Sequence, residues 1–368
     1  MKILLINLML YTTQPGYADI PRKKTIKNTM IYNFIKGFYK NGHSVTLVAG
    51  EPFSPLYTEK YQCEIIWLPL GFRKILPNGL MYPVGLYSYL KKNHKEYDLI
   101  ISSDVFSFCS LFASMVCPEK LLIWHEPGKY HDKFFQLPAR LWYNIPVRIF
   151  MKNKVVVIAR SEVAKSFISR YCNCLSPEYI DHGIDLDIFY FSEKKEKYLM
   201  VVAQLIPRKC IDTILRKFSD FIKKYNSEYT LYIAGDGPER EKLEDLTKQL
   251  GISDNVCFAG FLMQPQLVER LSHASGILID SQQEFSMVSI PESIVCGTPV
   301  LTNSVPYPAA YVKSDSLGIV KDNWNADDIL MLLNHQKEFT ENCRKRRPYM
   351  SNQYLAKHML ELYENLKK

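Results

Sequence analysis

Two adjacent cations occupy a position where a helix would normally avoid them. Arg208 and Lys209 follow the apolar run Tyr198–Val202 and stand directly before a segment with the apolar spacing of a helix. The N-terminus of a helix is already positive because of its macrodipole, so cations are normally unfavourable there. An anion bound between the two side chains and the free backbone N–H groups, most simply a diphosphate, would explain them. An ordinary solvated basic loop is the structural alternative.

Two carboxylates follow a later apolar run, Gly276–Asp280. Glu284 lies in the loop beyond this run, where it could accept hydrogen bonds from sugar hydroxyls. Glu292 has a structural alternative, because Ser289 and Glu292 have the spacing of a capping box with Pro291 between them. The pattern therefore leaves Glu292 open between a ligand-binding and a capping role.

A glycine-rich turn separates two further elements. Gly235-Asp-Gly-Pro-Glu239 follows the apolar run Tyr229–Ala234 and precedes a strongly helical segment. Glycine for a tight turn, proline in the first helical turn and glutamate near the helix start account for it structurally. The alternative is a close approach of the Gly235 backbone to a nucleotide.

One histidine and one pair of aspartates could also take part in catalysis or in metal binding. His125 closes the apolar run Lys120–His125, at the end of a strand where ligands of parallel sheets bind. Asp185 and Asp187 form a DxD pair, which could hold a divalent cation against a diphosphate. We favour a turn between two domains over a metal site for this pair.

The elements that must position these residues form two series. Short β-rich runs alternate with helical segments, which is typical of a parallel sheet covered on both faces. The predicted strands are 3–7, 44–49, 64–68, 98–102, 120–125 and 154–158, then 198–202, 229–234, 255–258, 276–280 and 299–302. The predicted helices are 26–40, 84–95, 106–115 and 161–171, then 211–225, 239–250, 264–272 and 291–296, with long helical stretches after them.

The charged segment 192–197 is the predicted linker between these two series. We therefore expect an α/β protein with two doubly wound domains facing across a cleft. The domains are residues 1–190 and 191–345, with a C-terminal helix, 346–368, packing back towards the first domain.

Composition narrows the class of protein. The chain has 368 residues and is 47% hydrophobic and 23% charged, which excludes a disordered or fibrous protein. Its nine cysteines form no CxxC motif, so we expect a reducing cytoplasm and no structural zinc.

The charge is distributed unevenly along the chain. Residues 1–190 hold 23 basic and 15 acidic residues, whereas the remainder holds 23 of each. This asymmetry indicates an anionic partner for the first half: nucleic acid, a phosphorylated acceptor or a membrane surface.

Taken together, the motifs resemble glycosyltransferase family 4, a group 1 glycosyltransferase family with the GT-B fold of two Rossmann-like domains. The resemblance is specific over roughly 198–302 and looser before it. It rests on the segments 206–209, 233–240, 259–261, Glu284 with Glu292, and 296–300, and in the first half on 2–7, 41–46, His125, 159–162 and 182–185. In place of the family's Gly-Arg pair, this chain has Ala203-Gln204, so Arg208 is expected to substitute for the arginine.

The resemblance implies a function and a site. The expected reaction is the transfer of a sugar, with retention of configuration and without a metal or other cofactor, from a nucleotide-diphosphate sugar to a saccharide or polyprenyl-diphosphate-linked acceptor. The implied pathway is bacterial cell-surface polysaccharide synthesis. The expected catalytic residues are His125, Lys209 and Glu284; the expected donor-binding residues are Arg208, Gly235, Ser286, Met287, Val288 and Glu292. Lys209 would hold the diphosphate, Glu284 the sugar and Glu292 the ribose.

The acceptor side is expected in the first domain. Gly16, Arg22 and Lys23 follow the first strand, and the aromatic and basic segment 72–92 could dock on an anionic membrane. The expected location is the cytoplasm, with peripheral contact on the inner face of the membrane. Two alternatives stay open: a nucleotide-sugar epimerase on the same fold, and a non-catalytic nucleotide or nucleic-acid binder. Motifs for nucleic-acid recognition are absent, so no nucleic-acid partner is expected.

Overall fold

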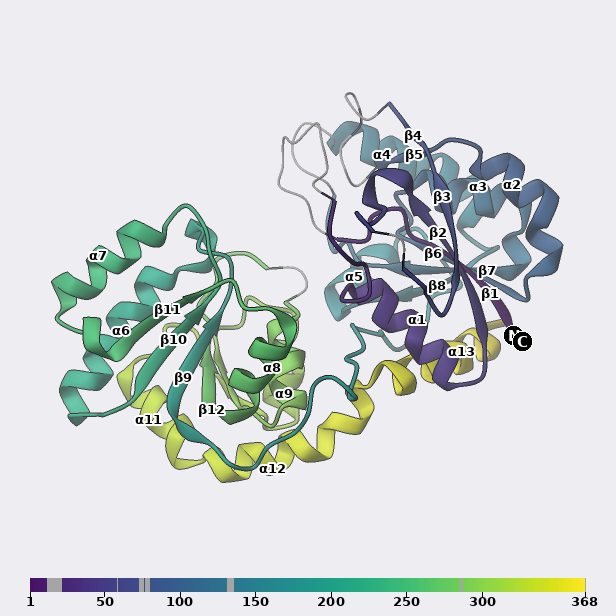
Figure 1. The fold of residues 1–368 in the computed structure, drawn as a ribbon. Helices are drawn as coiled ribbons and strands as arrows, with labels where there is room; N and C mark the ends of the chain where they lie inside the picture. The colour runs from purple at the N-terminus through teal and green to yellow at the C-terminus, as the bar shows by residue number, and fades with distance from the viewer. Residues whose placement is uncertain are drawn as a thin grey trace. The chain divides into compact units, whose positions relative to one another are not determined.

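The computed structural model describes residues 1–367 except 12–21, 58, 73–75, 77–79, 131–135 and 285–286. The chain forms two compact units (Figure 1). Unit 1 comprises Met1–Gly183 and Asn352–Lys368, and unit 2 comprises Ile184–Ser351. The charged segment 192–197, predicted as the linker, lies inside unit 2, where Glu196 and Lys197 begin a strand.

The core of unit 1 is a parallel six-stranded sheet in the order β3-β2-β1-β6-β7-β8. The strands are β1 (Lys2–Ile6), β2 (Ser44–Gly50), β3 (Glu64–Leu68), β6 (Leu99–Ser103), β7 (Leu121–His125) and β8 (Val156–Ala159), and a small antiparallel pair is formed by β4 (Leu70–Gly71) and β5 (Tyr82–Pro83). The helices are α1 (Met30–Lys40), α2 (Leu86–Asn93), α3 (Phe108–Val116), α4 (Gln136–Asn144), the π-helical turn η6 (Val147–Met151), α5 (Glu162–Ile168) and α13 (Asn352–Lys367), with short 3₁₀ turns η1 (Glu51–Phe53), η3 (His94–Glu96) and η4 (Pro118–Lys120).

The last helix of the chain completes unit 1. One face of the sheet packs on α1 and α13, and the other on α2, α3 and α4. The buried Asn352 side chain, at the start of α13, donates a hydrogen bond to the Asn33 carbonyl oxygen. A Cβ atom on Gly37 would lie 2.2 Å from the Asn352 carbonyl oxygen, so only glycine allows the two helices to approach this closely.

Unit 2 repeats the same topology. Its parallel sheet has the order β11-β10-β9-β12-β13-β14. The strands are β9 (Glu196–Val202), β10 (Thr230–Ala234), β11 (Val256–Gly260), β12 (Ala274–Leu278), β13 (Val300–Thr302) and β14 (Gly318–Val320). The helices are α6 (Ile211–Tyr225), α7 (Arg240–Leu250), α8 (Gln264–His273), α9 (Ser289–Val295), α10 (Ala309–Ser314), α11 (Ala326–Asn334) and α12 (Gln336–Arg346), with 3₁₀ turns η7 (Pro207–Lys209), η8 (Ser253–Asn255) and η9 (Arg347–Met350). Helices α6, α7 and α11 cover one face, and α8, α9 and α12 the other (Figure 1).

Both sheets have the strand order of a Rossmann fold, in which the chain reverses direction across the sheet beside its first strand. Each strand predicted from the sequence is present, and its ends differ by two residues at most. Helix α4 and strand β14 were not predicted. Two prolines interrupt the helical pattern around α4, and β14 is only three residues long. The switch points lie between β1 and β6 in unit 1 and between β9 and β12 in unit 2, and ligands of such sheets bind beyond the carboxyl ends of these strands.

Candidate active site

The switch point of unit 2 brings the predicted cations and the first predicted carboxylate together. The loop after β9 carries Arg208 and Lys209 in η7, and the loop after β12 carries Glu284. The Lys209 ammonium forms an ion pair with Glu284, and both side chains are largely buried. Arg208 Nη1 lies 2.9 Å from Glu284 Oε1 and also donates to the Gln283 carbonyl oxygen. Two segments far apart in the sequence thus form one charged cluster.

The backbone around η7 fixes this cluster in place. Cys210 adopts a left-handed conformation with φ 47°, which ends η7 and starts α6 in a new direction. The backbone N–H of Gln282 donates to the Arg208 carbonyl oxygen over 2.9 Å, so the two loops are tied together directly. The cluster holds two cations and one carboxylate, and Arg208 remains 44% exposed. The two cations can therefore bind an anion, and Glu284 can then accept hydrogen bonds from other donors in their place.

The glycine-rich turn supports this loop from the side. A Cβ atom on Gly235 would lie 1.8 Å from the Ala203 carbonyl oxygen, and its φ of +143° strains any other residue. Gly237 has a similar contact, 2.5 Å, with the Leu205 carbonyl oxygen. The Leu205 N–H donates to the Asp236 carbonyl oxygen, which ties the turn to the β9–α6 loop. Both glycines thus have a structural reason that does not require a ligand.

Glu292 does not form the capping box that its spacing allows. Helix α9 begins at Ser289, its N-cap residue is Val288, and no side chain caps it. The capping alternative is therefore wrong, because Ser289 already lies inside the helix. Within the described residues, the Glu292 carboxyl forms no ion pair or hydrogen bond, and burial raises its pKa to about 8. A carboxyl kept partly buried without such a partner needs a reason other than the helix start.

The other predicted donor-binding residues have varied surroundings. Met287 is buried in the core of unit 2, whereas Val288 is 36% exposed. Ser286 lies outside the described residues.

Sequence reasoning missed a network that holds the end of β12. Lys217 of α6 lies 2.6 Å from the Asp280 carboxylate, and its ammonium stands over the Trp324 ring. The Asn303 amide donates to Asp280 Oδ1 and to the Ser281 carbonyl oxygen. This network anchors the loop that leads to Glu284. The signal available in the sequence was Asp280 at the end of a predicted strand, but its partners Lys217 and Asn303 come from two distant segments.

In unit 1, His125 lies fully buried at the carboxyl end of β7. Its Nδ1 accepts a hydrogen bond from the Val105 N–H at 3.3 Å and lies 3.6 Å from Asp104 Oδ1. Because Nδ1 is an acceptor, the neutral ring carries its proton on Nε2. Asp104 adopts a left-handed φ of 61°, and its Oδ1 also accepts from the Glu126 N–H. A strained aspartate beside a buried histidine is typical of a functional site.

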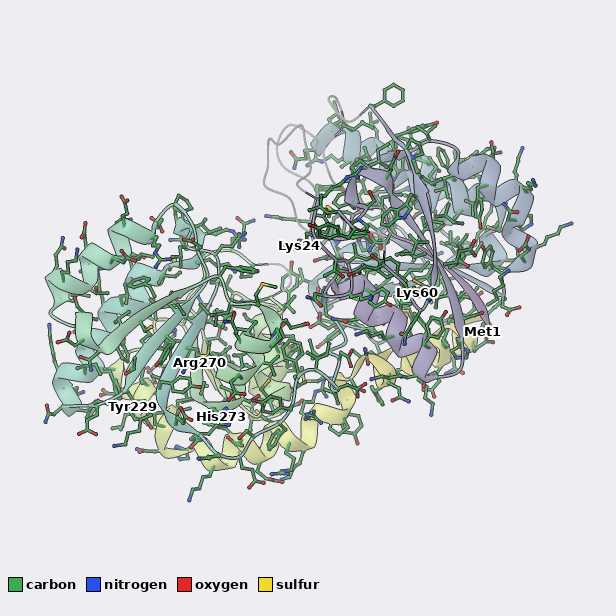
Figure 2. The ribbon with its side chains drawn as sticks, in the orientation of Figure 1. Met1, Lys24, Lys60, Tyr229, Arg270 and His273 are labelled. Atoms are coloured by element: carbon green, nitrogen blue, oxygen red, sulfur yellow. The ribbon has the colours of Figure 1, made fainter. Side chains whose placement is uncertain are left out.

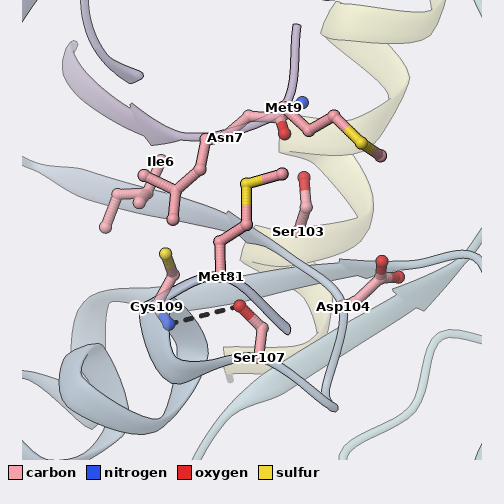
Figure 3. A pocket seen from close by; sticks show the side chains of 9 residues that line it. Ile6, Asn7, Met9, Met81, Ser103, Asp104, Ser107 and Cys109 are labelled. Carbon is pink, nitrogen blue, oxygen red and sulfur yellow. Dashed lines mark hydrogen bonds between the residues drawn. The ribbon is translucent and has the colours of Figure 1, made fainter. Parts of the chain in front are cut away.

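A small pocket of about 70 Å³ lies at the switch point of unit 1, beyond the ends of β1 and β6 (Figure 3). Asn7 and Met9 line it from the segment after β1, and Ser103, Asp104 and Ser107 line it from the end of β6 and the segment after it. Met81 extends between these two sides in Figure 3. The pocket mixes thioethers with hydroxyl and carboxylate oxygens, so it can contact both apolar and polar parts of a ligand.

The predicted acceptor residues are only partly described. Gly16 lies outside the described residues. Arg22 is exposed, and the Lys23 ammonium lies over the Tyr11 ring at 4.6 Å. Burial lowers the pKa of Lys23, because desolvation disfavours the charged form of its ammonium.

No group of three or more histidine, cysteine, aspartate or glutamate side chains is placed to hold a metal ion within the described parts of the chain. Asp185 Oδ1 accepts a hydrogen bond from the Asp187 N–H, which is the geometry of a local turn.

A separate hollow in unit 2 lies beside the first half of β9. Arg270 and His273, both labelled in Figure 2, line it with Tyr198 and Tyr232. The Arg270 guanidinium stands 4.7 Å from the centre of the Tyr232 ring, so the guanidinium already covers the aromatic surface of this hollow.

Two known families match this chain over most of both units. Residues 28–188 match the family described as glycosyltransferase family 4, and residues 187–350 match glycosyl transferases group 1. The chain belongs to glycosyltransferase family 4. Its fold is GT-B, with two Rossmann-like units, as the sequence predicted.

Individual relatives are similar to this chain over different lengths. The chain is 24% identical over 337 residues to N-acetyl-alpha-D-glucosaminyl L-malate synthase of Bacillus anthracis, covering 81% of this chain and 86% of that one. It is 28% identical over 177 residues to alpha-monoglucosyldiacylglycerol synthase of Streptococcus pneumoniae, covering 44% of this chain and 40% of the relative. The match thus spans less than half the length of some of the relatives.

A solved structure has the same fold. HepE of Anabaena, crystallised with UDP, has a TM-score of 0.69 and 16% identity, covering 99% of this chain and 100% of that one.

Proposed function

We propose that this family 4 protein transfers a sugar from a nucleotide-diphosphate sugar to a saccharide or polyprenyl-diphosphate-linked acceptor, with retention of configuration and without a metal. The cluster of Lys209, Arg208 and Glu284 at the switch point of unit 2 carries the proposal. Such a position binds nucleotides in Rossmann folds, and two cations there match the charge of a diphosphate.

The charges of the cluster suggest the course of the reaction. A donor diphosphate would take Lys209 and Arg208 from Glu284, and the freed carboxylate would accept hydrogen bonds from sugar hydroxyls. The C1–O bond to the diphosphate breaks while both cations stabilise the charge that develops on the leaving oxygen. The acceptor oxygen then bonds to C1 on the face that the diphosphate leaves. The acceptor proton passes to the departing phosphate oxygen. In this scheme, His125 donates its Nε2 proton in a hydrogen bond to the donor sugar.

Glu292 is proposed as the ligand of the nucleotide ribose. Its raised pKa means that a ribose binding to the ionised carboxylate competes with a proton at neutral pH. The substitution E292Q keeps a similar shape and removes the charge. Measured at about pH 9, where the wild-type carboxylate is ionised, it should weaken nucleotide affinity by roughly 1.5 to 3 kcal/mol, the scale of a hydrogen bond to a charged group. Unchanged affinity would exclude this ligand role.

The acceptor and the location of the enzyme rest on other observations. No helix in the described parts of the chain is long and apolar enough to cross a membrane. One relative is named as a glucosyldiacylglycerol synthase, which favours an acceptor at a lipid surface. The nine cysteines are free in the structure, which favours a reducing compartment. We propose that the reaction takes place in the cytoplasm, with peripheral contact on the inner face of the membrane and bacterial surface polysaccharide as the product class.

A thermal-shift screen of nucleoside diphosphates and nucleotide sugars tests the donor class. A ligand at about 100 times its dissociation constant should stabilise the protein by ~2.7 kcal/mol. Nuclear magnetic resonance of the product formed with a polyprenyl-diphosphate saccharide then shows its anomeric configuration. A protein that binds no nucleotide in the screen, or a product with inverted configuration, would contradict the proposal. Conversion of the donor sugar without any acceptor would instead indicate an epimerase.

A further inference from the structure

A row of aliphatic side chains projects from α4 and η6 into solvent. Leu137, Leu141, Ile145 and Ile149 are 67%, 52%, 53% and 55% exposed. They are spaced four residues apart, so they form one ridge along a single face of the helix. We call these four residues the α4 ridge. Exposed apolar residues are normally scattered, and a continuous row of them indicates a surface that contacts something.

The ridge is held in place by the opposite face of the same helix. Ala139, Tyr143, Val147 and Met151 are at most 1% exposed and pack in the core of unit 1. They also stand four residues apart, offset from the ridge by two residues, which places them on the opposite side of the helix. The helix is therefore firmly docked, and its exposed row is not a consequence of poor packing.

Backbone geometry keeps the ridge in line. Residues four apart drift around an α-helix, because 3.6 residues make a full turn. Pro146 has no N–H to continue the α-helical pattern, and the π-helical turn η6 follows, with the Lys152 N–H bonded to the Val147 carbonyl oxygen. A π turn holds more residues than an α turn, so it offsets part of this drift.

The charges around the ridge have one sign. Arg140, Arg148, Lys152 and Lys154 lie in the segment 136–154, which has no aspartate or glutamate. Arg140, Arg148 and Lys154 are exposed. A helix with one apolar row, flanking cations and no carboxylates is suited to the interface of an anionic lipid layer.

We infer that the α4 ridge docks unit 1 on a membrane surface of anionic lipid. The ridge would enter the boundary between head groups and acyl chains while the cations contact lipid phosphates. The inference rests on the peripheral membrane contact of the proposed function and deepens it, because it names the surface that makes this contact. A second copy of this chain is a poor occupant, since pairing two such faces would bring their cations together.

This surface differs from the segment 72–92 that the sequence suggested. Helix α2 presents Lys91 and Lys92 to solvent, but its apolar residues Leu86 and Leu90 are fully buried. The described part of that segment therefore offers charge with only a few scattered exposed apolar side chains, whereas the α4 ridge offers both together. The two surfaces make opposite predictions for substitutions.

Flotation of the full chain with vesicles tests the inference without any substrate. Wild-type protein should bind vesicles of phosphatidylcholine mixed with phosphatidylglycerol, and should bind phosphatidylcholine alone much more weakly. The variant L137S/L141S/I145S/I149S should lose at least about 100-fold in affinity, because each side chain loses apolar contact with the lipid. The variant R140Q/R148Q/K154Q should lose about fivefold for each cation removed, and high salt should have the same effect on wild type.

Matched variants show whether the effect belongs to this face. M263S/M331S removes two exposed methionines of unit 2, 57% and 48% exposed, and should bind like wild type. K91E/K92E should also bind within about twofold of wild type, since α2 has no row of exposed apolar residues. Circular dichroism confirms that each variant is folded.

Two outcomes would overturn the inference. In one, the ridge variant binds vesicles as wild type does, or K91E/K92E alone abolishes binding. In the other, light scattering shows a wild-type dimer and a monomeric ridge variant, which would make the ridge a protein interface. Failure of vesicle binding would leave the donor site untouched, because nucleotide binding by unit 2 is measured separately in the thermal-shift screen.

Discussion

Replacing Glu292 by Gln should make the protein more stable, and the gain should grow with pH. Burial raises the pKa of Glu292 to about 8, against 4.5 for an ordinary glutamate. The folded chain therefore keeps a proton that the unfolded chain releases, so wild-type stability falls as the pH rises from about 4.5 to about 8 and stays low above that. At 1.36 kcal/mol for each pH unit, the full cost is up to about 5 kcal/mol. Gln cannot ionise, so E292Q escapes this cost.

The expected gain is about 1 kcal/mol at about pH 5 and about 4 to 5 kcal/mol at about pH 9. Urea unfolding followed by circular dichroism at these two values measures it. Glu241→Gln is the matched control, because Glu241 lies exposed in the first turn of α7, and it should show no growing gain. An E292Q gain of the same size at both pH values would refute the reasoning. It would mean that Glu292 ionises in the folded protein as freely as it does in water.

Three further predictions concern the site and its support. Lys209→Ala should lower turnover by about 10² to 10³-fold, as expected when one preorganised donor to a developing charge is lost. Steady-state assays measure this loss, with Lys248→Ala on the exposed surface of α7 as the control. Normal turnover of Lys209→Ala would mean that Lys209 does not bind the diphosphate. Gly235→Ala should destabilise unit 2 severely, since the new Cβ would lie 1.8 Å from a carbonyl oxygen. Gly251→Ala is the control, because its Cβ would have nothing within 4 Å and should cost only about 1 kcal/mol of stability. Equal melting temperatures for the two variants would contradict the close approach at Gly235. Activity should survive excess EDTA, and a loss that Mg²⁺ or Mn²⁺ restores would return Asp185 and Asp187 to consideration as ligands.

Much of the fold could be predicted because its signals are local. Buried parallel strands appear as short apolar runs, and their alternation with helical segments already indicates two doubly wound units. The cations at 208 and 209 were also a local signal, because they violate the preference of a helix N-terminus. The same kind of reasoning failed for α4, where Pro138 and Pro146 conceal a helix that tertiary packing of Ala139 and Tyr143 stabilises.

The types of residue in the candidate site, and the strands whose ends carry them, could be read from the sequence alone. Which of these residues meet depends on how the strands are ordered in the folded sheet. Lys209 and Glu284 are far apart in the chain and pair because the sheet order places β9 beside β12. Spacing allowed Glu292 a capping role, but the helix starts one residue too early in the chain for Ser289 to be its cap. Spacing could not show that one row of α4 faces the core and the other faces solvent, because periodicity distinguishes the two faces of a helix but not the partners that cover them.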